Sequence, residues 1–160
     1  MSPSLGRTCY VAAVLIVFAG CTGSPRHAEE PTRAAARGER IAALAQTLIG
    51  SPYRFGGADP SGFDCSGLVF FVHQELGINV PRTAAGQSLA AVPVRSSDLE
   101  PGDVVFFRDS GPEATHVGLY VGEYRFVHAP KTGRPVSYAS LQDDYYRATF
   151  LGAGRLYTEP

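Results

Sequence analysis

The sequence has 160 residues, of which 44% are hydrophobic and 18% charged, and its formal net charge at pH 7 is −1. This length and balance fit one globular domain with a hydrophobic core and short terminal extensions. The near-neutral charge and the lack of any run of Lys and Arg argue against a nucleic-acid partner. No stretch of 18 consecutive apolar residues is present, which argues against an ordinary transmembrane helix.

The N-terminal residues have the pattern of an export signal. Arg7 precedes an unbroken apolar run at residues 10–19, which is the length of a signal-peptide core. Small residues then precede Cys21, an arrangement that resembles the lipobox of bacterial lipoproteins, with Phe18 where Leu is usual. The resemblance implies a signal peptide at residues 1–20, cleavage before Cys21 and lipidation of its thiol. Plain secretory cleavage near Gly20 is the alternative.

Residues 21–37 are expected to form a flexible tether. They contain Pro25, Pro31 and scattered charges without apolar periodicity. Thr22, rather than Asp, follows the cysteine, which by resemblance to sorted lipoproteins implies the outer membrane, facing the periplasm. We therefore expect a lipid-anchored protein of the cell envelope that contacts the membrane through its anchor and is a monomer. Residues 38–160 would form its folded domain.

The rest of the chain has helical patterns first and strand patterns afterwards. Apolar periodicity predicts helices at about residues 34–49, 65–76 and 83–89, with a loop rich in Gly and Pro at residues 51–62. Strands are expected at residues 104–108, 116–121, 125–129 and 149–157, and a short helix at residues 140–147. This order predicts an α+β fold, with the helices, including the one that begins at Cys65, packed on one face of an antiparallel sheet.

Cys65 stands at the junction between the glycine-rich loop and the second predicted helix. Asp64 is a suitable N-cap, so Cys65 would be the first helical residue, where the positive end of the helix dipole favours a thiolate. If residues 1–20 are removed and Cys21 is acylated, Cys65 is the only thiol left. Such a thiol in an exported protein is exposed to oxidation, and a role as nucleophile in acyl transfer explains its presence. The alternative is a small, inert core residue.

A cysteine nucleophile needs a histidine base and a polar group that orients this base. Two of the four histidines do not meet this need. His27 lies in the predicted tether, and His73 comes eight residues after Cys65 on the same predicted helix. The rise of a helix places His73 ~12 Å from Cys65, too far to share a proton, and we expect it to be partly exposed.

His116 and His128 are the remaining candidates, and they flank a predicted hairpin whose midpoint is Gly122. If the turn holds an odd number of residues or a bulge, the two histidines face each other across the strands. Both would then leave the sheet on the face that packs the Cys65 helix, as a base and its orienting partner or as two separate polar residues. The alternating apolar residues would point to the opposite face: Val117, Leu119, Val121 and Val127.

A zinc site is a rival interpretation of the same residues, because Cys65, His116 and His128 all have side chains that bind zinc. Structural zinc sites usually include a C-x-x-C or H-x₃-H pair, and the sequence has neither. We therefore expect no metal and no other cofactor.

Six segments of the chain resemble a known family in the same order. They are PYRFGG (52–57), FDCSGLV (63–69), PRTA (81–84) followed by Gln87, LEPGDVVFF (99–107), THVGLYVG (115–122) and FVHA (126–129). Together they resemble the NlpC family of bacterial cell-wall cysteine peptidases, which have a papain-like fold. The match covers about residues 38–157, so it extends over almost the whole predicted domain.

The resemblance implies a role for each residue near the thiol. Cys65 would be the nucleophile, His116 the base and His128 the residue that orients the base. The resemblance also implies a set that binds the oxyanion or the substrate, with Tyr53 at the oxyanion beside the Cys65 N–H: Tyr53, Asp64, Ser66 and Arg82.

The implied substrates are stem peptides of peptidoglycan, cut between D-glutamate and a diamino acid or at the diaminopimelate cross-link. Two alternatives stay open. One is a non-hydrolytic wall-binding or scaffold lipoprotein on the same fold, and the other is an acyltransferase that uses the same Cys and His pair.

Overall fold

The computed structural model describes residues 33–108 and 111–157. The predicted signal peptide, the lipidation site Cys21 and most of the predicted tether lie outside these residues. Residues 33–37 were predicted as the end of the tether, but they form the start of helix α1 (Arg33–Thr47). Three consecutive alanines favour helix there, so the tether prediction ran too far. Among the described residues, no helix is both long enough and apolar enough to cross a membrane.

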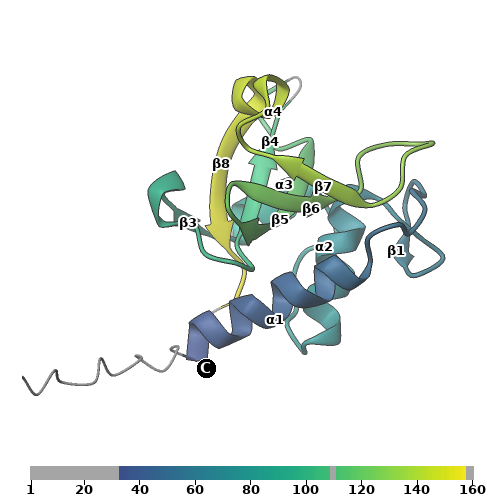
Figure 1. Cartoon of the computed structure of the whole chain (residues 1–160), viewed down its shortest axis with the longest axis horizontal. Helices are drawn as coiled ribbons and strands as arrows, with labels where there is room; N and C mark the ends of the chain where they lie inside the picture. The colour runs from purple at the N-terminus through teal and green to yellow at the C-terminus, as the bar shows by residue number, and fades with distance from the viewer. Residues whose placement is uncertain (1–32, 109–110, 158–160) are drawn as a thin grey trace, which may run out of the picture.

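The first three predicted helices are confirmed to within two residues at each end, whereas the short helix predicted at residues 140–147 begins four residues later, as α4 (Asp144–Thr149). After α1 comes a small hairpin, β1 (Ala58–Asp59) and β2 (Gly62–Phe63), and then α2 (Cys65–Glu75) and α3 (Ala84–Ala90). Helix α2 packs against both α1 and the sheet (Figure 1). This position explains why α2 is apolar on most of its faces, with Leu68, Val69 and Val72 fully buried.

The strands form one antiparallel sheet of six in the order β3-β8-β4-β5-β6-β7. Their bounds are β3 (Val92–Val94), β4 (Val104–Phe107), β5 (His116–Gly122), β6 (Arg125–His128), β7 (Ser137–Ser140) and β8 (Phe150–Arg155). A 3-10 turn, η1 (Ser96–Asp98), follows β3, and α4 (Asp144–Thr149) precedes β8. The sequence did not predict β3, which has Pro93 at its centre, or β7, whose SYAS sequence lacks apolar alternation.

The sheet buries apolar side chains on both faces. Val104, Phe106 and Leu119 pack with α1 and α2, whereas the side chains that alternate with them belong to a second cluster. Tyr146 of α4 packs against this second cluster, whose buried members are Val105, Phe107, Tyr120 and Phe126. The α+β prediction is therefore confirmed, but the helices are not confined to one face of the sheet.

The hairpin between β5 and β6 has the bulge that the sequence analysis required. The chain turns at Glu123 and Tyr124, with φ of 52° and 59°, and the pairing shifts between Tyr120 and Gly122. Because Leu119 pairs with Val127, His116 and His128 do not face each other directly, as we predicted they would. They are displaced from that pairing by two residues. An offset of two keeps both on one face, because side chains alternate with a period of two.

The face that the two histidines share is the opposite of the one predicted. His116 lies 6.0 Å from Phe107 and His128 lies 5.1 Å from Phe126, between ring centroids, so both belong to the side of the second cluster. The apolar residues that alternate with them pack on the side of α1 and α2 instead: Val117, Leu119, Val121 and Val127. The larger core lies on that side, where Val117, Leu119 and Val127 are buried and Val121 packs against them.

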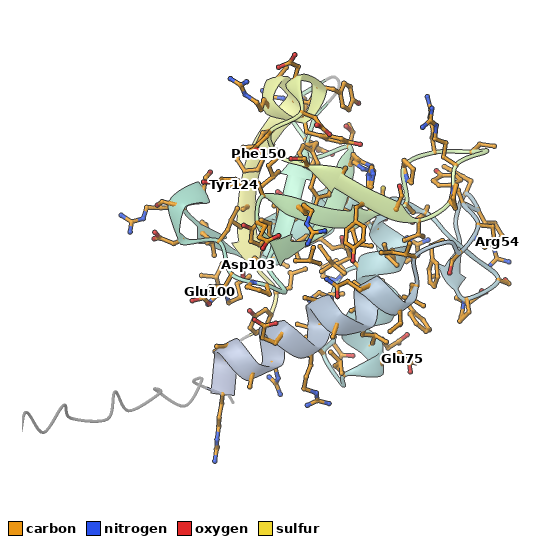
Figure 2. All side chains as sticks on the ribbon, viewed as in Figure 1. Arg54, Glu75, Glu100, Asp103, Tyr124 and Phe150 are labelled. Atoms are coloured by element: carbon orange, nitrogen blue, oxygen red, sulfur yellow. The ribbon has the colours of Figure 1, made fainter. Side chains whose placement is uncertain are left out.

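A buried ion pair joins the start of β4 to β8, the last strand in the sequence. Asp103, before β4, is fully buried and accepts hydrogen bonds from Nε and Nη2 of Arg155 in β8 at 2.7 and 3.0 Å. Arg155 also lies 2.8 Å from a carboxylate oxygen of Glu100. Figure 2 shows Glu100 and Asp103 together near α1, away from Arg54 on the β1–β2 side. This pair fixes the start of β4 against β8.

His73 is not partly exposed, as predicted, but fully buried in α2. Its Nδ1 lies 2.8 Å from the carbonyl oxygen of Val69, and its Nε2 has no hydrogen-bond partner among the described residues. Burial lowers the pKa of His73 to about 4, so the folded protein keeps this ring neutral.

The buried His73 predicts a specific acid sensitivity. Because its folded pKa lies below the ordinary value of 6.5, its contribution to stability is complete above pH 6.5 and is lost as the pH falls towards 4. His73→Gln removes this titration. The stability difference between wild type and variant should therefore shrink by up to about 1.4 kcal/mol per pH unit across that window. Urea unfolding of both proteins at pH 7, 6 and 5 measures it, and parallel stability curves would contradict the prediction.

Candidate active site

The site is built on the N-terminus of α2. Asp64 is the N-cap, and its Oδ1 accepts a hydrogen bond from the Gly67 N–H at 2.6 Å. Its Oδ2 accepts another from the Gly56 N–H at 3.0 Å, which ties the glycine-rich loop to the helix. The predictions that Asp64 caps the helix and that Cys65 begins it are both confirmed.

Three of the predicted substrate-binding residues form one network. The Arg82 guanidinium donates to both oxygens of Asp64 at 2.9 and 2.8 Å, to Ser66 Oγ at 3.1 Å and to the carbonyl of Gly57 at 3.1 Å. Burial opposes ionisation of Asp64, but the hydrogen bonds from Arg82 and the Gly67 N–H hold its pKa below the usual value. Arg82 is thus engaged within the protein, where it holds the carboxylate that caps α2.

The surroundings of Cys65 do not favour a resting thiolate. Burial, and next the negative charge of Asp64, raise the pKa of the thiol, although the N–H groups of Ser66 and Val117 act in the opposite direction. The expectation that the helix N-terminus alone would favour thiolate is therefore wrong. The effect of the Val117 N–H on the thiol pKa places the sulfur at the start of β5, because Val117 directly follows His116.

His116 and His128 are in direct contact. Nε2 of His116 lies 2.7 Å from Nδ1 of His128, and the ring planes are 77° apart. His128 is only 3% exposed. Burial, and next the charge that His116 can carry, lower the pKa of His128 to about 3. His128 therefore stays neutral at physiological pH, and in this contact one ring nitrogen donates and the other accepts.

Tyr146 is a site residue that the sequence analysis missed. Its Oη lies 3.4 Å from Nε2 of His128, and its ring stands at 82° to the His128 ring. Edge-on contacts with Phe107 and Phe126 hold the tyrosine in place. It lies outside the six family-like segments, so only the packing of α4 on the sheet reveals it.

The hydroxyl of Tyr146 can decide which nitrogen of His128 carries the proton. When Oη accepts from an Nε2–H of His128, Nδ1 is left unprotonated. Nδ1 can then accept the Nε2–H of His116, which leaves Nδ1 of His116 unprotonated.

Tyr53 lies near Cys65 as well. It is half-buried and forms an isolated bridge with Phe63. Burial raises the pKa of its hydroxyl, and so do the charges of Cys65 and Asp64, which shows that both lie within electrostatic range. Within residues 33–108 and 111–157, no three His, Cys, Asp or Glu side chains gather in a way that could hold a metal ion.

The sequence of the site region matches a known protein family. The NlpC/P60 family matches residues 50–155, which contain all of the residues described above. The chain belongs to the NlpC/P60 family. Relatives include a murein DD-endopeptidase, MepH, of Escherichia coli, which is 45% identical over 115 residues. That alignment covers 69% of this chain and 42% of MepH.

Other NlpC/P60 relatives agree in sequence and in fold. A probable endopeptidase of Corynebacterium glutamicum is 39% identical, over 78% of this chain and 57% of its own length. An NlpC/P60 family protein from Bacillus cereus superposes with a TM-score of 0.71 at 31% identity, over 79% of this chain and 41% of its own. The NlpC/p60 domain of the peptidoglycan hydrolase SagA superposes with a TM-score of 0.65 at 33% identity, over 73% and 97%. The fold is therefore the papain-like α+β fold of this family.

Tyr146→Phe tests the contact between the tyrosine and His128. The variant keeps the ring that packs on Phe107 and Phe126 but loses the hydroxyl, so His128 should no longer hold its proton on Nε2 alone. ¹⁵N NMR of the imidazole nitrogens measures the tautomer. Tyr124→Phe, on the hairpin turn, is the matched control and should leave the His128 signals unchanged. An unchanged His128 tautomer in Tyr146→Phe would contradict the role given to the hydroxyl.

Proposed function

We propose that the protein is a peptidoglycan endopeptidase that cleaves stem peptides through an acyl-enzyme on Cys65. The observation that carries the proposal is the 2.7 Å contact of His116 with His128 at the end of the sheet where the Cys65 thiol lies. The names of the relatives support the same class of substrate, since they include a murein endopeptidase and a peptidoglycan hydrolase. The chain spans about half the length of the first relatives, 42% of one and 57% of the other, so their activities enter only as support.

The proposed reaction begins with proton transfer from Sγ of Cys65 to Nδ1 of His116, because Nε2 is engaged with His128. The sulfur attacks the carbonyl carbon of the peptide, and the N–H of Cys65 and the hydroxyl of Tyr53 stabilise the oxyanion. His116 returns its proton to the leaving nitrogen, the C–N bond breaks, and the amine departs. Water then gives a proton to His116 and attacks the thioester, which releases the acid and restores the thiol.

The bond that is cut is proposed to be the diaminopimelate cross-link, with the bond between D-glutamate and the diamino acid as the alternative. The printed name of MepH, a DD-endopeptidase, favours the cross-link. Incubation with purified peptidoglycan and mass analysis of the products separates the two. Cleavage of the cross-link converts dimers to monomers with intact stems, whereas cleavage after D-glutamate shortens the stems. Products joined to an added amine would instead support an acyltransferase.

Cys65→Ala should abolish release of peptides from peptidoglycan, because the proposed acyl-enzyme forms on the thiol that the variant lacks. The half-buried thiol contributes little packing, so the variant should unfold at nearly the same urea concentration as wild type. Chromatography of released peptides measures the activity. Activity within tenfold of wild type would remove Cys65 from the mechanism. If the wild-type protein binds peptidoglycan but releases nothing, the non-hydrolytic scaffold is favoured.

We also propose that acylation of Cys21 anchors the protein in the outer membrane, facing the periplasm. The basis is the signal-peptide and lipobox pattern, with Thr22 after the cysteine. Cys21→Ser in the full-length chain should then move the protein from the membrane fraction to the soluble fraction, because acyl chains would hold it. Fractionation with a carbonate wash measures this. A variant that still pellets with membranes would rule out the anchor.

A further inference from the structure

A cleft opens beside His116. It has a volume of about 340 Å³ and is lined by His116, Pro130, Lys131, Arg134, Tyr145 and Tyr146. Its walls are the loop between β6 and β7 and one side of α4. The lining holds two cationic side chains and no acidic one, and it is continuous with the proposed base.

The two cations are available to bind a ligand. Lys131 and Arg134 are both exposed, and a hydrogen bond from the Arg134 N–H to the Lys131 carbonyl holds them in one turn of the loop. In the described part of the chain, neither forms an ion pair with a carboxylate. Several other arginines do form such pairs: Arg54, Arg82, Arg95, Arg125, Arg147 and Arg155.

The proposed chemistry determines which part of the substrate enters this cleft. His116 must protonate the leaving nitrogen, so this nitrogen must come within hydrogen-bond distance of the His116 ring. The residue that carries the nitrogen then extends into the space that His116 lines. For both candidate bonds this residue is the diaminopimelate, which keeps a free carboxylate at its D-centre.

We infer that Lys131 and Arg134 form a carboxylate subsite for the diamino acid whose amine leaves. This inference rests on the proposed function and names the substrate feature that the site selects. Arginine and lysine bind carboxylates through charge-assisted hydrogen bonds. The rings of Tyr145 and Tyr146 also line the cleft, and the methylene chain of the diamino acid would pack against them. Stem peptides with a free carboxylate would thus be preferred over those in which it is amidated.

Two matched pairs of synthetic stem peptides test the subsite. One pair contains the cross-link and the other the bond after D-glutamate, and the members of each pair differ only in a carboxylate or a carboxamide at the D-centre. Wild type should cleave the carboxylate form at least about tenfold more efficiently in kcat/KM, the size expected of a charge-assisted contact. Lys131→Gln with Arg134→Gln should reduce this preference to about twofold or less, mainly through KM.

The control is Arg33→Gln with Arg40→Gln, on α1, which removes the same charge from a distant exposed surface and should keep the preference. Isothermal titration calorimetry of the same peptides with Cys65→Ala measures their affinity for the subsite without turnover. Equal affinity for the carboxylate and carboxamide forms, or a preference that survives in the Lys131 and Arg134 variant, would overturn the inference. A binding preference without cleavage by wild type would instead support the subsite and reject the proposed endopeptidase.

Discussion

The structure of the site depends on the contact between Nε2 of His116 and Nδ1 of His128. The two rings meet because a bulge in β5 keeps both residues on one face of the sheet, although they are not directly opposite. His128 can orient its neighbour because burial keeps it neutral, with its pKa lowered to about 3. A charged His128 would repel a protonated His116. The aromatic side chains that contact His128 would therefore serve the proposed base, His116, as well as the fold.

A second constraint acts at the other side of the thiol. Asp64 caps α2, and its charge also raises the pKa of Cys65, so the residue that places the proposed nucleophile also opposes its ionisation. Arg82 holds this carboxylate in place with two hydrogen bonds, which lower the pKa of Asp64. The packing is close, since a Cβ on Gly67 would overlap the carbonyl oxygen of Gly57. In the proposed mechanism the thiol thus rests protonated and becomes nucleophilic when His116 accepts its proton.

Local patterns were enough to predict part of this arrangement. The cap at Asp64, the start of α2 at Cys65 and the bulged hairpin all depend on neighbours in the sequence. The face of the sheet that carries the histidines was predicted wrongly, because the strand pattern alone does not say on which side the larger core lies. Tyr146, from α4, and the burial of His73 depend on packing between distant segments. The raised pKa of the Cys65 thiol depends on its burial and on the charge of Asp64, and burial is set by packing that the local pattern does not contain.

The central claim is that Cys65 carries the acyl half of the substrate during turnover. Protein and an equal amount of stem peptide can be mixed and quenched in acid at several times within the first turnover, followed by intact-protein and fragment mass spectrometry. The account predicts a transient mass increase equal to the acyl half of the cleaved peptide, on the fragment that contains Cys65. Product formation with no covalent adduct at any time, or an adduct on another residue, would contradict it.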